Sequence, residues 1–272
     1  AELAAAEGST FVHPYDDADV IAGQGTIALE VLATDPDVGA VVVPVGGGVL
    51  SAGIAAAVKE QRPDVLVVGA QCAAYPNFAK AFRGNSWDAE SSTSGTTIAD
   101  GIAVKQPGAL ARALVASTVD DVVTVAEASI ERAICLYLEV EKTVAEGAGA
   151  ASLAAVLEHP GVFAGRRTVM VVSGGNIDPR VLSSVALRGL MRQGRLSRVR
   201  VTMRDLPGQL GAVAAALAAL GANVVDVTHD RLSAQLTSRS AAVDFLIETL
   251  DGDHARDVVA GLVEHGFDVD LV

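Results

Sequence analysis

The sequence is poor in aromatic residues and in cysteine. Aromatic residues make up 4% of the 272 residues, which predicts an interior of small aliphatic side chains. The two cysteines, Cys72 and Cys135, lie in apolar segments without a CxxC spacing, so we interpret them as small buried thiols and expect no metal. No secretory signal is recognisable at the start of the chain. We therefore expect a cytoplasmic protein.

Basic side chains and long apolar runs are also scarce. The formal net charge is -13 at pH 7, whereas binding to phosphate backbones needs clustered lysine and arginine. One basic segment, residues 188–200, favours a solvated linker face over a polyanion site. No run of 18 apolar residues is free of charges and glycines. We expect neither nucleic acid nor a membrane as a partner.

Apolar strand-like segments alternate with helical ones up to Gly194. Examples are residues 40–45 and 64–71, separated by a small-residue helix. Continuous apolar strands between helices indicate a parallel sheet covered on both faces, so the predicted class is α/β. After Gly194 the pattern changes to the order βαββαβ, which is the ferredoxin-like arrangement. We predict two domains, residues 1–194 and 195–272.

The segment VVVPVGGGVLSAG, Val41–Gly53, joins a predicted strand to a predicted helix through three glycines. Unshielded N–H groups at the start of a helix form an anion site. The simpler alternative is a tight turn that binds nothing. A dinucleotide-binding GxGxxG pattern would need glycine at Ser51, and no GK[ST] follows as in a phosphate-binding Walker loop. We therefore expect the phosphate of some other ligand.

Three further segments accompany this loop. VMVVSGGNID, residues 169–178, places Ser173 at a strand end, where α/β sheets bind ligands, although a capping serine would look the same. EKTVAEGAGAASLAAVL places Glu146 before small residues that allow either close helix packing or a flat ligand. FVHPYDDADVIAGQGTIALEVL has GQGT at the predicted entry to a helix, and its His13 is more simply structural than a base.

Together these segments resemble the fold type II pyridoxal-phosphate enzymes, and among them the threonine and serine dehydratases (threonine ammonia-lyases). The resemblance covers about residues 1–190 and includes TIADGIAVKQPG at 97–108. It implies a tryptophan-synthase-β-like fold. The remainder, with RDLPGQLGAVAAALAALGANVVDV, resembles an ACT regulatory domain.

The resemblance implies pyridoxal 5'-phosphate as cofactor. The residues implied to contact it are Gly46, Gly47, Gly48, Val49 and Leu50 at the phosphate, Ser173 at the pyridine nitrogen and Gly101 at the ring edge. Glu146 is expected near the reacting amino acid. Val49 stands where the family usually has a fourth glycine, and a β-branched residue disfavours positive φ, so we expect some loss of phosphate affinity. Gln71 replaces an acid that binds a metal in related racemases.

The implied reaction is β-elimination from threonine or serine, which yields a 2-oxo acid and ammonia and needs a Schiff-base lysine. In the family this lysine lies in an SFKxRGA segment that does not occur here. We interpret the chain's four lysines, Lys59, Lys80, Lys105 and Lys142, as surface residues. The chain is therefore expected to be an inactive C-terminal part of a longer enzyme, with apolar surface exposed around residues 41–57.

The second domain is expected to bind a small-molecule effector, commonly at a dimer interface. The implied effector residues are Asp205, Leu206, Pro207 and Gly208, with Gly221, Ala222 and Asn223; Asp205 could equally be an acid near a helix N-terminus. We expect a homodimer or homotetramer. The alternatives are a non-catalytic small-molecule-sensing dimer module and a related serine racemase, and both Gln71 and the ACT-like segment count against the racemase.

Overall fold

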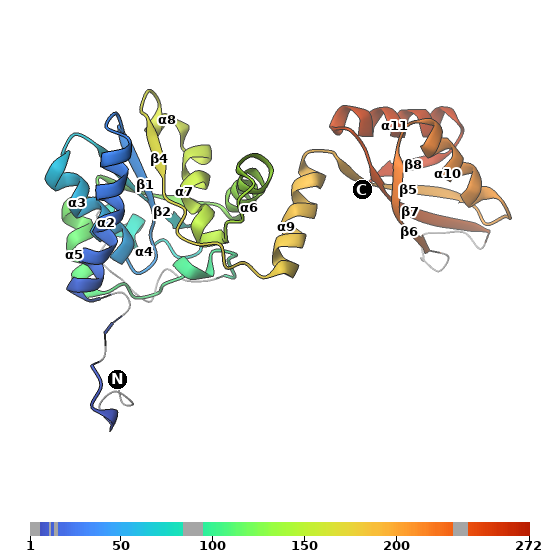
Figure 1. The fold of residues 1–272 in the computed structure, drawn as a ribbon. Coiled ribbons are helices and arrows are strands. Elements are labelled where there is room, and N and C mark those ends of the chain that lie inside the picture. The colour runs from blue at the N-terminus through green and yellow to red at the C-terminus, as the bar shows by residue number, and fades with distance from the viewer. Residues whose placement is uncertain (1–5, 11, 14–15, 84–94, 231–238) are drawn as a thin grey trace. The chain divides into compact units, whose positions relative to one another are not determined.

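The computed structural model describes residues 6–10, 12–13, 16–83, 95–230 and 239–272. The chain divides into two compact units, Ala1–Pro179 and Arg180–Val272 (Figure 1). The predicted boundary after Gly194 falls at the other end of helix α9 (Pro179–Arg192), which the division places in the second unit. Within the described ranges, no helix combines the length and hydropathy needed to cross a membrane.

The first unit contains a parallel sheet in the strand order β3-β2-β1-β4. Its strands are β1 (Ala40–Pro44), β2 (Leu66–Cys72), β3 (Asp121–Val125) and β4 (Thr168–Met170). Val42 of β1 pairs with Val68 on one side and with Met170 on the other. Every residue of β1 is buried, which is typical of a sheet covered on both faces. The predicted α/β class with a parallel sheet is confirmed.

Helices supply that cover. They are α2 (Ala18–Thr34), α3 (Val49–Gln61), α4 (Asn77–Phe82), α5 (Ala109–Thr118), α6 (Glu127–Leu136), α7 (Gly147–Glu158) and α8 (Pro160–Phe163). One apolar core joins Val41 and Val43 to residues of α2, α3 and α5, and α7 packs against β1, β2 and β3. The end of α6 widens into a π-helical turn, η2 (Tyr137–Glu141).

Helix α2 begins earlier than predicted. Its N-cap is Asp17, whose carboxylate accepts hydrogen bonds from the N–H groups of Asp19 and Val20 at 2.9 and 3.2 Å. The GQGT segment therefore lies inside α2, and the prediction that it enters the helix is wrong. A Cβ atom on Gly25 would lie 3.1 Å from the carbonyl oxygen of Gly53 in α3. The absence of a side chain at Gly25 therefore permits close packing of α2 against α3.

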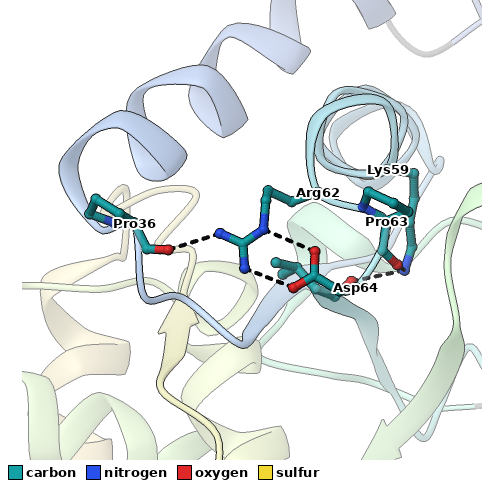
Figure 2. A network of polar contacts seen from close by, with 6 residues as sticks. Pro36, Lys59, Arg62, Pro63 and Asp64 are labelled. Atoms are coloured by element: carbon teal, nitrogen blue, oxygen red, sulfur yellow. Dashed lines mark hydrogen bonds and ion pairs between the residues drawn. The ribbon is translucent and has the colours of Figure 1, made fainter.

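The far end of α3 is fixed by a polar network (Figure 2). Arg62 donates two hydrogen bonds to the carboxylate of Asp64, at 2.9 and 2.8 Å, and a third to the carbonyl oxygen of Pro36 at 2.8 Å. The Nζ atom of Lys59 lies 2.7 Å from a carboxylate oxygen of Asp120 and donates to Val65. Lys59 is thus a half-buried, ion-paired residue, which corrects its interpretation as a simple surface lysine.

The second unit has the predicted order βαββαβ. After α9 come β5 (Leu196–Arg204), α10 (Gln209–Ala219), β6 (Asn223–Asp230), β7 (Ser240–Glu248), α11 (Gly252–Glu264) and β8 (Asp268–Leu271). The antiparallel sheet has the order β6-β7-β5-β8. Its core joins Val199, Phe245 and Ile247 to Leu217 and Leu262 of the two helices.

The basic segment 188–200 is not a linker. It covers the last turns of α9 and the first half of β5. Arg200 forms a bidentate ion pair with Asp244, with N–O distances of 2.6 and 2.7 Å. The prediction of a solvated linker face is therefore wrong for this segment, because it consists of a helix end and the beginning of a strand inside a paired sheet.

Candidate functional site

The three glycines at 46–48 connect β1 to the start of α3. Gly48 is the N-cap of α3 and has φ +95°, a left-handed conformation that glycine adopts without strain. Among the hydrogen bonds of the described residues, none has the N–H of Gly46, Gly47, Gly48, Val49 or Leu50 as donor. Unpaired N–H groups at the positive end of a helix favour an anion. This geometry fits the predicted phosphate site.

Two side chains that the sequence analysis missed support the loop. The buried Ser51 hydroxyl donates to the carbonyl oxygen of Gly48 at 3.0 Å. A Cβ atom on Gly48 would lie 2.7 Å from Cζ of Phe78 in α4. In the sequence, Ser51 argued only against a GxGxxG pattern. No motif near Phe78 indicates that it contacts the loop. The two contacts leave the loop little room for a side chain at position 48.

Val49 does not disturb the loop as predicted. It is the first residue of α3, it is 8% exposed, and it belongs to the apolar core. The positive φ falls on Gly48, and Lys142 is the one non-glycine residue with positive φ among the residues described. Because no left-handed conformation is required at Val49, the expected loss of phosphate affinity has no structural basis.

The TIADG segment closes over the loop. It forms the 3-10 turn η1 (Asp100–Ile102). A Cβ atom on Gly46 would lie 2.8 Å from Cα of Ile102 and 3.3 Å from the carbonyl oxygen of Gly101. The glycine at 46 is therefore needed for a close approach between two backbones. The structure brings the predicted residues Gly46 and Gly101 together.

Glu146 and the SGG segment complete the cluster. A Cβ atom on Gly101 would lie 3.1 Å from Cβ of Ala148 and 4.0 Å from Oε1 of Glu146. A Cβ atom on Gly174 would collide with the same Glu146 carboxylate, and the N–H of Glu146 donates to the carbonyl oxygen of Gly174 at 3.1 Å. The glycine loop, the TIADG segment, Glu146 and the SGG segment, all predicted to carry function, thus meet in one place.

Ser173 lies where the sequence predicted, just past the end of β4. The N–H of Val171 donates to the carbonyl oxygen of Val42 at 3.0 Å, so the chain still follows β1 at this point. Ser173 then leaves the sheet at the edge where β1 passes into the glycine loop, and it is exposed. An exposed hydroxyl at the carboxyl end of a parallel strand is available to a ligand.

The side chain of Gln71 ends inside the protein. Its side chain is fully buried, its Oε1 accepts the N–H of Ala79 at 3.1 Å, and its Nε2 has no hydrogen-bond partner. The structure describes no group of three or more His, Cys, Asp or Glu side chains that could hold a metal ion within its described ranges. Cys72 and Cys135 are buried thiols, as predicted, and burial raises the pKa of Cys72.

Side-chain contacts are known for two of the four lysines, Lys59 and Lys142. Lys59 sits ten residues after the start of α3, about 15 Å along the helix from the glycine loop. Lys142 donates to the carbonyl oxygen of Glu139 at 2.6 Å, and Lys105 is exposed while Lys80 is half-buried. Lys59 and Lys80 are thus less exposed than predicted.

The predicted exposure around residues 41–57 is wrong. Val41, Val45, Val49 and Ile54 are all buried in this chain. They pack against α2 and α5, and those two helices belong to the chain itself. The apolar surface of this segment is therefore already covered.

The predicted effector residues form two groups in the second unit. Asp205, Leu206, Pro207 and Gly208 precede α10, and Gly221, Ala222 and Asn223 follow it. Because α10 has eleven residues, the groups lie roughly 16 Å apart along the helix. One copy of the chain does not bring them together. Gly208, with φ +89°, is the N-cap of α10, so Asp205 is not its side-chain cap.

The site in the first unit combines an anion-binding loop, a hydroxyl at a strand end and a carboxylate, arranged on glycine-lined backbone. A phosphorylated planar ligand matches this combination, because the glycines leave space where side chains would collide. The family described as "Pyridoxal-phosphate dependent enzyme" matches residues 1–174. The chain belongs to this family. Its cofactor is pyridoxal phosphate, and the residues present fit the phosphate group.

Known relatives agree with this assignment. An L-threonine ammonia-lyase of Thermotoga maritima is 42% identical over 265 residues, which is 97% of this chain and 65% of that protein. A protein of the same name from Geobacter sulfurreducens gives the same identity and coverage. The chain therefore spans 65% of the length of either relative.

Solved structures also resemble this chain. A threonine deaminase from T.th. is 38% identical, with a TM-score of 0.61, over 65% of this chain and 60% of that one. Maize serine racemase is 31% identical, with a TM-score of 0.61, over 67% of this chain and 57% of that one. The predicted fold type II pyridoxal-phosphate architecture is confirmed.

Proposed function

We propose that this chain carries the cofactor site and a regulatory domain of a threonine ammonia-lyase, an enzyme that converts threonine or serine to a 2-oxo acid and ammonia. The observation that carries the proposal is the meeting of the glycine loop, Gly101, Glu146 and the SGG segment at one edge of the sheet. The 42% identity to L-threonine ammonia-lyases over nearly the whole chain supports the reaction class.

Each group has a role in this proposal. Pyridoxal phosphate, when bound, supplies the electron sink for chemistry at the α-carbon of an amino acid. The N–H groups of Gly46, Gly47 and Gly48 hold the phosphate, with those of Val49 and Leu50 at the start of α3. The Ser173 hydroxyl bonds the pyridine nitrogen, and unlike a carboxylate it does not hold that nitrogen protonated. Glu146, beside Gly101, orients the reacting amino acid.

The cofactor-binding lysine is proposed to come from outside these 272 residues. Two of the four lysines already have other partners, because Lys59 is ion-paired far along α3 and Lys142 binds a carbonyl at η2. The chain on its own is then expected to bind pyridoxal phosphate without a covalent bond and to be inactive. Intact mass after borohydride reduction tests this: a stoichiometric adduct on any lysine would contradict the proposal.

The reaction itself is tested in a chimaera. In this chimaera, the part of the T. maritima relative that this chain does not match is joined to residues 1–272, which form its C-terminal part. We expect 2-oxobutanoate and ammonia from threonine, and pyruvate from serine. A Ser173→Ala variant, which removes the hydroxyl, is expected to lose most activity while retaining the fold. Formation of D-serine without ammonia would favour the racemase alternative, and inactivity of a folded, cofactor-loaded chimaera would contradict the proposal.

For the second unit we propose an ACT-type regulatory domain that binds a small amino acid or a nucleotide as effector. Its βαββαβ order and the sheet order β6-β7-β5-β8 support this. The two groups of predicted effector residues lie at opposite ends of α10, so we propose that a second copy of the chain completes the site in a homodimer or homotetramer. A non-catalytic sensing dimer would need only this unit.

Calorimetry of the whole chain tests the regulatory role. An effector should raise the unfolding temperature of the second unit, and the Gly208→Val variant should abolish the shift. Gly266→Val is the matched control, because Gly266 also has a positive φ but lies outside the proposed site. A panel of amino acids and nucleotides without any shift, or a chain that stays monomeric at saturating ligand, would contradict the proposal.

A further inference from the structure

Residues 97–108 form a strap that crosses the glycine loop without joining the sheet. Within the described part of the chain, its own backbone hydrogen bonds are confined to η1 and the residues just after it, such as the bond from the N–H of Ile102 to the carbonyl oxygen of Ala99 at 3.1 Å. At Ile102 it lies against Gly46, and at Gly101 it faces Glu146. The strap therefore limits the space above the loop.

Side chains from distant elements hold the strap at its two ends. At its start, Glu127 of α6 accepts the N–H of Ile98 at 2.5 Å and the hydroxyl of Thr97 at 2.9 Å. At its end, Asp16 accepts the N–H groups of Ala109 and Leu110, the first residues of α5, at 3.1 and 2.9 Å. Glu127 thus takes the place of a backbone partner for Ile98, and Asp16 caps the N-terminus of α5.

Asn77 holds the middle of the strap. Its side-chain amide is buried and donates to the carbonyl oxygens of Val104 and Lys105, at 3.0 and 2.8 Å. Asn77 begins α4, and the next residue, Phe78, contacts Gly48 of the loop. Helix α4 thus touches the strap and the loop through adjacent residues. Loop and strap are held in register by the same short helix.

We propose that Glu127, Asn77 and Asp16 are positioning residues that hold the strap over the glycine loop and thereby set its affinity for a phosphorylated cofactor. The proposal rests on the proposed use of pyridoxal phosphate at that loop. None of the three side chains needs to touch the cofactor. They act through Ile102 and Gly101, whose backbone approaches Gly46 and Glu146.

Asp16 and Asp17 provide a matched pair for the test. They are adjacent, both are half-buried, and each carboxylate caps one helix: Asp17 caps α2, and Asp16 caps α5 from a distance. Both Asp→Ala variants lose one cap, so the two should lose similar stability. The Asp16 variant alone releases the strap. A purely structural role would make the two variants alike in every measurement.

The experiment measures amide exchange and cofactor binding in the whole chain. In Asp16→Ala we expect about tenfold faster exchange of the 97–108 peptides and about tenfold weaker binding of pyridoxal phosphate, equivalent to the loss of one or two hydrogen bonds. Asp17→Ala should speed exchange in α2 and leave strap exchange and cofactor binding unchanged. Glu127→Ala should behave like Asp16→Ala, and Glu127→Gln, which keeps an acceptor oxygen, should restore part of the affinity.

The outcomes separate this proposal from the proposed function. Unchanged strap exchange in Asp16→Ala, or equal loss of cofactor affinity in the two aspartate variants, would overturn the positioning role. Failure of the unaltered chain to bind pyridoxal phosphate would overturn the proposed cofactor site and the affinity claim that rests on it. The exchange measurement needs no cofactor, so it decides independently whether Asp16 holds the strap.

Discussion

A glycine of each unit shows a different role for this residue. In the first unit, Gly149 of α7 provides space, because a Cβ atom on it would collide with the carbonyl oxygen of Gly174. In the second unit, Gly208 provides conformation, because it has φ +89° and a Cβ atom there would meet nothing within 4 Å; Gly211 of α10 is equally open. Glycines that make room mark the places where backbone or ligand approaches closely. The cofactor site lies among them.

The two sheets differ in how much of their surface is buried. Strand β1 is buried along its whole length, so its side chains serve packing and its function lies at its carboxyl end. Strand β5 alternates, with Val199 and Val201 in the core and Arg198 and Arg200 on the opposite face. A sheet with one polar face can interact along that face.

The largest expected effect comes from Gly149→Ala. The new methyl group would meet the backbone of Gly174, which cannot move without displacing Ser173 and Glu146. We expect a loss of about 3 kcal/mol in the free energy of unfolding of the first unit and loss of pyridoxal phosphate binding. Urea unfolding and equilibrium dialysis measure the two effects.

Gly211→Ala is the counterpart in the second unit. Gly211 also lies in a helix, but a methyl group there meets nothing within 4 Å. Alanine should therefore stabilise α10 by about 0.5–1 kcal/mol, because it restricts the unfolded chain and favours the helix. A similar destabilisation by both substitutions would show that the contrast between the two kinds of glycine is wrong.

Gly48→Ala and Gly208→Ala sharpen the comparison further. Both glycines are helix N-caps with nearly equal positive φ, so each alanine introduces about 1–2 kcal/mol of backbone strain. Only Gly48 is also packed, against Phe78. We expect Gly48→Ala to cost about 1 kcal/mol more than Gly208→Ala and to weaken pyridoxal phosphate binding. Equal costs in calorimetry would mean that Phe78 yields and that conformation alone matters at the loop.

The sequence was sufficient to predict what depends on local pattern. The parallel sheet follows from continuous apolar strands, the βαββαβ order from alternation and helix ends, and the loop at 46–48 from its position between strand and helix. The resemblance placed Gly101, Glu146 and Ser173 in one site, and the structure brings their segments together. These features depend on patterns among neighbouring residues, so they can be predicted from a single sequence.

Contacts between distant residues could not be predicted in the same way. Asp16 and Asp17 look alike in the sequence, yet one caps α2 and the other caps α5, 94 positions away at Leu110. The partners of Asn77 and Glu127 are likewise set by the fold. Nor did the sequence show that the positive φ falls on Gly48 rather than on Val49.

Val49→Gly tests that last point. It introduces the fourth glycine usual in the family, but it removes a side chain that is 8% exposed and part of the core. We expect a loss of about 2 kcal/mol in stability and no gain in pyridoxal phosphate affinity, because the left-handed residue is already glycine. Tighter cofactor binding in equilibrium dialysis would restore the view that Val49 limits the loop.

Another small effect is expected at the charged face of the second unit. The bidentate hydrogen bonds from Arg200 lower the pKa of Asp244 below its ordinary value of 3.8. A lowered folded-state pKa stabilises the fold above the unfolded-state value, and this contribution is lost as the pH falls through the folded-state pKa. With the Arg200 side chain 42% exposed, screening limits the contribution to about 1 kcal/mol.

Asp244→Asn should therefore reduce the stability of the second unit at pH 7 and make no difference once the pH lies below the folded-state pKa of Asp244. Asp253→Asn is the control, because its partner Arg256 and Asp253 itself are both largely exposed, and it should change little at either pH. Urea unfolding of the second unit at a series of pH values measures both variants. If the stability difference between Asp244→Asn and the unaltered chain stayed constant down to the lowest pH, position 244 would act through packing. The polar face of this sheet would then gain no more stability from charges than the buried sheet of the first unit does.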